Sequence, residues 1–475
     1  MKEPIVPPSR LQAARERLTP NSRPLDLTDV VCRELESRGF LSPEPRVLTT
    51  LFETLYFTSL RTEEGSTLTC HVIWLDPTDP DLSRPERLSG DRWTFIALAE
   101  PIALTVRSLA KLSRASDPRT SSFVVYAGPD GILRIYGFVD QGNQFYEFVN
   151  DRGSQPPDRP GLFQASIEGA GHLVVHLGYE VIAELRMNEL AEAPVDVLTS
   201  GSVFRKLRPS IVRHIVEVLN CVGPEAFEAG DDWPAVLANT WIASFCRLLL
   251  RCQNYRHGGA LLITPEQVTP HLNPRYRLTY DRLPKSLIRR GNYEIRRSIA
   301  HRSIHSDYIG SDGRVPPADT SSTPHVGDQT RTAIPAELYL DATLNEAYVQ
   351  ESSNSIDGAI WFISLLTRVD GLVVLDPSLR VTAFGTEITL SHDPGEVYLA
   401  GDAEGTPEFL RPLDDRHFGT RHLSMIRYCA ASPESVGFVI SQDGDVRAIT
   451  RVDDRVLVWD NVALRLDEFR TTAGG

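Results

Sequence analysis

The stretch from residue 367 to residue 449 constrains the fold more than any other part of the chain. It holds two pairs of short apolar segments, and between the pairs stands an amphipathic segment that begins Gly-Thr-Arg-His. Turns rich in Asp, Gly, Pro or Ser join the segments of each pair, which is typical of strands that fold back on one another. The expected strands are Leu372–Leu375, Arg380–Leu390, Val436–Ile440 and Val446–Ile449. This order predicts a mixed β-sheet flanked by helices, in the α/β (α+β) class.

A smaller α+β domain is predicted at residues 25–190. Asp26 or Thr28 is expected to cap a first helix that ends at Gly39, and a second helix follows Pro45. Alternating apolar residues then predict a run of strands, interrupted by a helix at Leu104–Leu112. The strands are expected at Leu68–Trp74, Thr94–Leu98, Phe123–Tyr126, Ile132–Val139, Phe163–Ile167, His172–His176 and Tyr179–Leu185.

The C-terminal domain is expected to span residues 200–465. It begins with helical segments, of which Val236–Cys252 is apolar on all sides and is expected to be buried. Residues 276–305 are strongly basic, which fits either a solvated surface or a phosphate-contacting one. Residues 306–333, rich in Pro, Ser, Thr and Gly, predict a mobile insert. Two helices are expected after it, at Pro335–Gln350 and Ser355–Leu366.

Length, net charge and the placement of the cysteines limit the class of protein that the chain can belong to. A chain of 475 residues is too long for one ordinary domain, and residues 1–24, rich in Pro, Arg and Ser, predict a flexible arm. The net charge of −14 argues against general binding to nucleic acids, whose phosphates need many cations. The chain contains no uncharged apolar run of about 18 residues or more, so no membrane span is predicted. The six cysteines are scattered, so free thiols in a reducing cytoplasm are expected.

Three short motifs carry the candidate chemistry. Asp370-Gly371 precedes a strand, where a carboxylate can hold Mg²⁺ or Mn²⁺ while the backbone approaches a ribose. Gly419-Thr420-Arg421-His422 opens a helix, whose free N–H groups and Arg favour phosphate oxygens, and His422 adds a hydrogen bond or a charge. Ser441-Gln442-Asp443-Gly444 ends a strand, and Asp443 is a candidate second ligand for metal or ribose. Each motif also fits a plain structural role, as a strand-entry turn, a helix cap and a hairpin turn.

In this order, the segments resemble the diadenylate cyclase (DAC) domain, a family that makes cyclic di-AMP from two ATP molecules. Asp370-Gly371-Leu372 matches the family's Asp-Gly-Ala motif, and Gly419-Thr420-Arg421-His422-Leu423 matches its Gly-Thr-Arg-His-Arg run. Gly259-Ala260-Leu261-Leu262-Ile263 is similar to the upstream strand, and the Ser441 motif to the downstream strand end. The resemblance covers approximately residues 235–465. The N-terminal region is similar to DACNV, the probable sensor domain found ahead of such cyclases.

The resemblance implies an ATP-dependent nucleotidyltransferase that forms cyclic di-AMP under the control of an N-terminal sensor domain. Asp370, Arg421 and His422 would be catalytic, and Asp370 with Asp443 would hold Mg²⁺ or Mn²⁺. The implied nucleotide contacts are Gly259, Gly371, Leu372, Gly419, Thr420, Arg421, His422 and Ser441. Each subunit would bind one ATP, so the resemblance also implies a face-to-face homodimer or a larger assembly.

Two residues depart from the family pattern. Leu372 replaces an Ala and is expected to crowd the nucleotide, whereas Leu423 replaces the second Arg and removes a phosphate contact. A literal Asp-Gly-Ala at Asp357-Gly358-Ala359 is set aside, because a helix-like run follows it without a returning strand. The departures leave open a sensor that binds nucleotide with weakened or absent chemistry. A scaffold that only mediates protein contacts and binds no nucleotide is the third reading.

Overall fold

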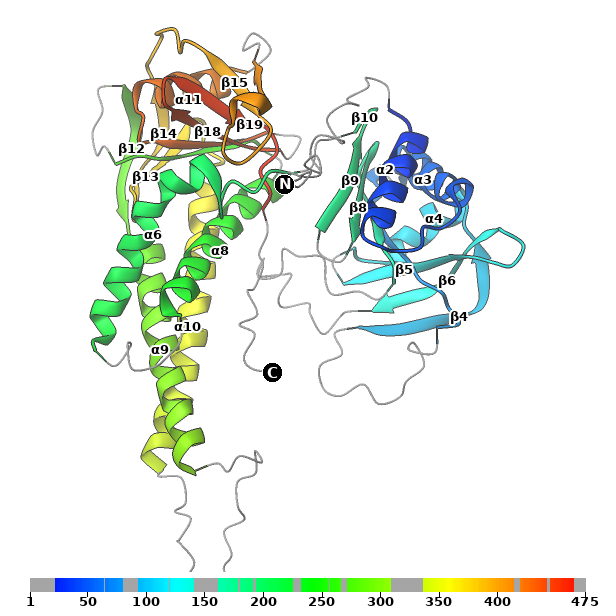
Figure 1. The fold of residues 1–475 in the computed structure, drawn as a ribbon, viewed down its shortest axis with the longest axis horizontal. Coiled ribbons are helices and arrows are strands. Elements are labelled where there is room, and N and C mark those ends of the chain that lie inside the picture. The colour runs from blue at the N-terminus through cyan, green and yellow to red at the C-terminus, as the bar shows by residue number, and fades with distance from the viewer. Residues whose placement is uncertain are drawn as a thin grey trace, which may run out of the picture. The chain divides into compact units, whose positions relative to one another are not determined.

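The computed structural model describes two compact units, Met1–Pro194 and Val195–Gly475, each built on its own β-sheet (Figure 1). Both sheets are mixed and flanked by helices, so the chain is of the α/β (α+β) class. The residues described are 22–63, 65–79, 93–118, 120–140, 161–177, 180–190, 194–224, 232–255, 257–265, 271–308, 336–413, 419–441 and 445–464. Most of the predicted arm, up to residue 21, and most of the predicted insert at 306–333 lie outside these ranges.

The described part of the N-terminal unit has three α-helices, α2 (Pro24–Ser37), α3 (Pro45–Ser59) and α4 (Val106–Leu112), close to the predicted segments. The predicted caps of α2 are wrong. Arg23 is the N-cap, and Asp26 lies three residues further on, where its carboxylate accepts a hydrogen bond from the Arg23 backbone at 2.6 Å. Thr28 lies a turn inside the helix and donates to the Pro24 carbonyl. Pro24 at the first helical position lets the helix start earlier, because Pro lacks the N–H that would go unpaired there.

An eight-stranded sheet forms the other layer of the N-terminal unit, in the order β10-β9-β8-β7-β3-β5-β6-β4. One face packs against α2, α3 and α4 through a core that includes Phe52, Phe123 and Phe163. A separate short hairpin joins β1 and β2. The strands are β1 (Thr62–Glu63), β2 (Ser66–Thr67), β3 (Cys70–Trp74), β4 (Thr94–Ala103), β5 (Ser121–Ala127), β6 (Leu133–Asp140), β7 (Gln164–Gly169), β8 (His172–Leu177), β9 (Glu180–Arg186) and β10 (Glu189–Leu190).

The C-terminal unit is organised around a nine-stranded sheet in the order β12-β14-β13-β11-β17-β18-β19-β15-β16. Its centre is formed by the strands that the sequence predicted. The β11 strand pairs in parallel with β13 and antiparallel with β17. The strands are β11 (Gly259–Ile263), β12 (Leu272–Tyr280), β13 (Leu372–Leu375), β14 (Val381–Ile388), β15 (Val397–Ala400), β16 (Leu410–Pro412), β17 (Val436–Ile440), β18 (Val446–Val452) and β19 (Arg455–Trp459).

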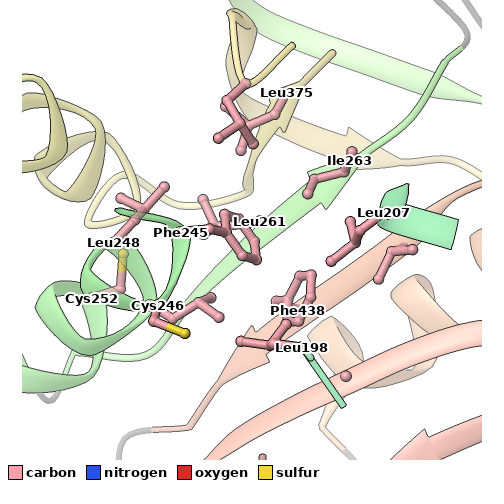
Figure 2. Packing of buried hydrophobic residues seen from close by; sticks show 14 of the residues in the cluster. Leu198, Leu207, Phe245, Cys246, Leu248, Cys252, Leu261, Ile263, Leu375 and Phe438 are labelled. Carbon is pink, nitrogen blue, oxygen red and sulfur yellow. The ribbon is translucent and has the colours of Figure 1, made fainter. Parts of the chain in front are cut away.

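Helices cover both faces of this sheet. Helices α6 (Gly201–Val222) and α8 (Trp233–Asn254) lie on one face, where Phe245 and Leu248 pack against Leu261 and Phe438 (Figure 2). Helix α11 (Thr420–Ala431) lies on the other face. Alternate residues of each strand therefore enter different cores. In β11, for example, Leu261 belongs to the first core and Leu262 to the second.

Two long helices, α9 (Arg282–Tyr308) and α10 (Ala336–Leu366), pair as a hairpin that extends beyond the ends of α6 and α8 (Figure 1). The prediction of two helices between 335 and 366 is wrong, because α10 is continuous. No Gly or Pro stands at the expected break, and Ser353 Oγ donates to the Val349 carbonyl at 2.9 Å without interrupting the helix. The sequence Asp357-Gly358-Ala359 lies inside α10, as predicted, and not at the mouth of a strand.

Helix α8 is the one helix of the described ranges that is long and apolar enough to cross a membrane, with a mean hydropathy of 1.2. No membrane span was expected from the sequence, because the chain has no long uncharged apolar run, and Arg247 and Arg251 lie within α8. Half of the most apolar window of α8 is buried within the protein, and Trp241 and Leu249 belong to the core. The core helix of a globular protein satisfies the same length and composition test.

His214 of α6 is a buried group that the sequence analysis did not single out. It lines a small pocket with Arg213, Trp241 and Leu287, and its Nε2 has no hydrogen-bond partner among the described residues. Burial lowers the pKa of His214 to about 4. The neutral imidazole is therefore the form that the folded protein accommodates at neutral pH.

We expect His214 to make the protein less stable as the pH falls from about 6.5 to about 4. In this range the unfolded chain takes up a proton that the folded protein does not, and the loss reaches at most roughly 3 kcal/mol. Urea unfolding at several pH values, compared with His214→Leu, measures the effect. The variant should lose less stability over this range, whereas parallel pH profiles for both proteins would contradict the assignment.

Candidate functional site

The predicted motifs of the C-terminal unit meet at one end of its sheet. Strands β11 and β13 run in parallel and begin side by side, β11 at Gly259 and β13 directly after Gly371. Strand β17 runs the opposite way, and its last residue, Ile440, pairs with Gly259. Strand β18 starts there too, with Val446 opposite Ile440. We call this the Gly259 end of the sheet, defined by Gly259, Gly371, Ile440 and Val446.

The first turn of α11 lies over the same end. Helix α11 leads through a short connection into β17, so it crosses the sheet face antiparallel to that strand. Its 12 residues span about 18 Å, close to the roughly 17 Å of the 5-residue strand β17. Gly437 allows the close approach, because a Cβ there would overlap the Met425 side chain of α11. The helix thus presents Thr420, Arg421 and His422 at the Gly259 end.

Asp370 and Arg421 therefore lie at the same end of the sheet, although about fifty residues separate them along the chain. Asp370 precedes β13 and is exposed, whereas Arg421 stands on α11 above β17 and β18. One strand, β11, lies between β13 and β17, so these two strands are roughly 10 Å apart in the sheet, and Arg421 lies in the helix layer above it. Neither side chain makes a hydrogen bond or ion pair within the described ranges, which leaves both available to a ligand.

Gly259 and Gly371 are needed for packing within the protein, a role that was not predicted from the sequence. Gly371 has a φ of +109°, and a Cβ there would lie 2.6 Å from the carbonyl carbon of Gly385 in β14. A Cβ at Gly259 would lie 3.0 Å from the Thr367 side chain. The close approach that these glycines permit is to the protein's own backbone and side chains. Their presence therefore does not by itself indicate a nucleoside.

Leu372 does not crowd an open site. It is 5% exposed and belongs to the core between the sheet and α11, together with Met425 and Ile426. Leu423, in the first turn of α11, is partly buried. The expected effect of Leu372 on a nucleotide thus lacks support, because its side chain fills the protein interior. The missing cation at Leu423 remains a real difference from the family pattern.

At the start of α11, backbone N–H groups remain unpaired among the residues that the structure describes. Gly419 is the N-cap and supplies no side chain, and nothing lies within 4 Å of the place where its Cβ would be. The N–H groups of His422 and Leu423 bond back to the Gly419 carbonyl. Those of Thr420 and Arg421 have no acceptor in the described part of the chain. Free N–H groups, the helix dipole and the Arg421 charge together favour an anion such as phosphate.

His422 connects α11 to two residues that the sequence analysis missed, Arg447 and Asp460. Arg447, the second residue of β18, places Nη1 2.9 Å from His422 Nε2 and forms an ion pair with Asp460. Burial, followed by the positive charge of Arg447, lowers the pKa of His422 to about 4, against an opposing effect of Asp460. His422 is thus neutral near pH 7 and enters the site as a hydrogen-bonding group. Arg421 and Arg447 supply the cationic charge.

Replacing Arg447 with Gln should raise the pKa of His422. The substitution removes a positive charge next to the imidazole and leaves the Asp460 carboxylate in place, while burial still holds the value below normal. Titration of the imidazole Cε1–H by NMR, assigned with His422→Asn, measures the change. An unaltered His422 pKa in Arg447→Gln would show that the two side chains do not interact.

Of the two predicted metal ligands, Asp370 lies at the Gly259 end of the sheet. Asp443 lies outside the described residues. Ser441 closes the β17–β18 turn, where its backbone N–H donates to the Asp445 carbonyl at 2.8 Å and its Oγ accepts from the Asp445 N–H. No group of three metal-binding side chains occurs in the described ranges. Mg²⁺ often takes one or two carboxylates together with substrate phosphates, and Asp370 can supply one such carboxylate.

Comparison with known proteins identifies part of the N-terminal unit. Residues 40–140 match the family model described as the probable sensor domain DACNV. The match includes α3, β3, β4, α4, β5 and β6, and so covers one edge of the eight-stranded sheet together with helices packed on it. No curated protein and no solved structure matches the chain. A probable sensor domain of the DACNV type is thus identified in the N-terminal unit, at residues 40–140.

Proposed function

We propose that the C-terminal unit is a cytoplasmic nucleotidyltransferase of the diadenylate cyclase type, which condenses two ATP molecules into cyclic di-AMP and pyrophosphate. The sensor domain in the N-terminal unit would control its activity. The observation that carries this proposal is the meeting of Asp370, the free N–H groups of α11 and Arg421 at the Gly259 end of the sheet. An acidic group at the same end of the sheet as an anion-binding helix start is a combination that suits a metal-bound triphosphate.

In this proposal the 3′-hydroxyl of one ATP attacks the α-phosphorus of a second ATP held by another subunit. The new ester bond forms as the bond to pyrophosphate breaks, and the hydroxyl proton is lost. The 3′-hydroxyl of the second ATP attacks the α-phosphorus of the first ATP in the same way, which closes the ring. Each subunit holds half of the reactants, so the proposal includes a homodimer in which two Gly259 ends face each other.

The chain's own residues would orient and stabilise the reacting groups. The Thr420 and Arg421 N–H groups and the Arg421 guanidinium would bind phosphate oxygens and stabilise the charge that develops on the leaving pyrophosphate. His422, neutral and in contact with Arg447, would donate or accept a hydrogen bond. Asp370, with Asp443, would hold Mg²⁺ or Mn²⁺, which supplies positive charge at the phosphates and makes the hydroxyl more acidic.

Incubation of the full chain with ATP and Mn²⁺, followed by mass detection of cyclic di-AMP, tests the proposal. We expect product to form at a rate that rises more steeply than linearly with protein concentration, because two subunits must meet. A chain that binds ATP and yields no product at any protein concentration would contradict the enzymatic part of the proposal.

A nucleotide-binding sensor without full chemistry is the second candidate. Leu423 favours it, because the family's second Arg is absent and the neighbouring His422 is neutral. This candidate predicts that ATP raises the melting temperature without turnover. A ligand present at about 100 times its dissociation constant stabilises the folded state by about 2.7 kcal/mol. The absence of any shift with ATP would exclude both candidates and leave a scaffold that binds no nucleotide.

A further inference from the structure

The outward face of α10 carries a regular pattern that the proposed nucleotide chemistry does not use. From Leu340 to Leu365, exposed residues follow one another at alternating steps of four and three along the helix. Alternating steps of this kind give the 3.5-residue period of a coiled-coil seam. We call these exposed positions the α10 seam. The opposite side of α10 is already occupied, because Ala342, Ile356 and Ile363 are buried against the rest of the unit.

Both ends of the α10 seam are apolar. Leu340 and Leu344, near the tip of the hairpin, are 57% and 43% exposed, and Trp361, near the sheet, is 54% exposed. Leu365 completes the seam at the sheet end. Large apolar side chains at both ends of a stripe roughly 37 Å long form two patches that water solvates poorly. The Arg251 guanidinium of α8 lies 4.5 Å from the centroid of the Trp361 ring, and Trp361 is still more than half exposed.

The middle of the seam is small and polar. Its members are Ala347, Glu351, Asn354 and Gly358, all exposed. At Gly358 nothing lies closer than 3.9 Å to the place where a Cβ would be, and the nearest atom belongs to Arg282. Small residues at Ala347 and Gly358 allow a second helix to approach closely. Glu351 provides a carboxylate and Asn354 an amide, so the Glu351 of one helix can accept a hydrogen bond from the Asn354 of another.

The α10 seam has the same order of residue types when it is followed from either end. Two large apolar residues, one small residue and one polar residue are followed by one polar, one small and two large apolar residues. A surface with this symmetry is complementary to itself when two copies run antiparallel about a two-fold axis. Leu340 then faces Leu365 of the second copy, Leu344 faces Trp361, and Ala347 faces Gly358. Glu351 faces the amide of Asn354. A parallel pairing would instead place the Glu351 carboxylates of the two copies opposite each other, which is unfavourable at a seam.

We propose that the α10 seam is an antiparallel docking surface for a second copy of this chain. The occupant is identified by this twofold complementarity of side-chain size and hydrogen bonding, since an unrelated partner would have no reason to match it in both directions. The hairpin has the geometry that such docking requires, because it extends beyond α6 and α8 (Figure 1). The paired hairpins form a four-helix bundle, with α9 and α10 contributed by each copy. This contact differs from the face-to-face contact of two Gly259 ends, and it requires no nucleotide.

Cysteine cross-linking of the full chain tests both the contact and its direction. Cys32 and Cys221, which are not buried, are first replaced with Ser to provide a silent background. Chains with Leu344→Cys are mixed with chains with Trp361→Cys and oxidised without ATP. We expect a disulfide-linked heterodimer from the mixture and little product from either variant alone. Within one chain the two positions lie roughly 25 Å apart along a straight helix, far beyond disulfide reach.

Two controls keep the test specific. Val216→Cys on α6, which is similarly exposed at 48%, is mixed with Trp361→Cys and should give no cross-link. Leu344→Glu, compared with Val216→Glu, should weaken association by about tenfold or more in light scattering, because the charge would face Trp361 of the other copy. Cross-linking of Leu344→Cys with itself would overturn the antiparallel direction. A mixture that never cross-links, or equal effects of both Glu variants, would overturn the proposal.

Discussion

Asp370→Asn is expected to lower cyclic di-AMP formation by roughly 10²-fold or more, because the substitution removes the carboxylate that would hold the metal and prepare the attacking hydroxyl. Asp370 is exposed and makes no hydrogen bond or ion pair within the described residues. Its replacement by the isosteric amide should therefore leave the thermal stability unchanged. Product measured by mass spectrometry at saturating ATP and Mn²⁺, alongside a calorimetric melt, separates loss of chemistry from loss of fold.

Asp357→Asn is the matched control, since Asp357 belongs to a literal Asp-Gly-Ala sequence. Its carboxylate pairs with Arg247 at 2.7 Å, and both side chains are mostly buried. Removing one partner of such a pair leaves a charge without compensation and should destabilise the unit. We therefore expect the two variants to differ in kind: Asp370→Asn folds and loses turnover, whereas Asp357→Asn retains turnover and melts earlier. Unchanged turnover in Asp370→Asn would refute the role assigned to Asp370.

Gly371→Ala is expected to destabilise the C-terminal unit by about 3 kcal/mol, because both the backbone conformation and the packing exclude a Cβ. A φ of +109° is strained for any residue other than Gly, and the Cβ would lie 2.6 Å from the Gly385 carbonyl carbon and 2.7 Å from the Thr386 nitrogen. Strand β14 would have to move away from the start of β13. Calorimetry of the full chain should show a lower transition for the C-terminal unit and an unchanged one for the N-terminal unit.

Gly395→Ala separates the two causes. Gly395 also has a positive φ, +77°, but nothing lies within 4 Å of its Cβ position. At Gly395 only the strain of a positive φ opposes the substitution, so the expected decrease in the free energy of unfolding is roughly 1 kcal/mol. If both substitutions cost the same, packing against β14 does not explain Gly371. The glycine would then be free to serve the ligand, as the sequence analysis first suggested.

Much of the fold could be predicted from local patterns. The strands at β11, β13, β17 and β18 follow from short apolar segments between turn residues, and α11 follows from the Gly419 start. The start of α2 was missed, and the continuity of α10 could not be predicted. Pro24 at the first helical position was a local signal for the earlier start of α2. The polar stretch at 351–354 continues the helix with Glu351 and Asn354 exposed and Ser352 buried. The continuity of α10 depends on what this stretch packs against, which local pattern does not encode.

The site was only partly accessible to sequence reasoning. Asp370 and Arg421 lie at the same end of the sheet because of the directions of the strands next to them. The order of the motifs along the chain, similar to that of the cyclase family, had predicted that the two residues share a site. The roles of Arg447 and Asp460 depend on cross-strand register, and the neutral state of His422 depends on burial. A signal was present: Arg447 is the second residue after a turn that the sequence analysis already placed near the site. Leu372 was misjudged because its face of the strand could not be known.

The most direct test is to locate the metal. Crystals of the full chain grown with Mn²⁺ and a non-hydrolysable ATP analogue would show the ion through its anomalous scattering. We predict Mn²⁺ within about 2.3 Å of an Asp370 carboxylate oxygen, with the analogue's phosphates at the Thr420 and Arg421 N–H groups. Manganese and nucleotide bound elsewhere, or an empty Gly259 end at saturating analogue, would contradict the account.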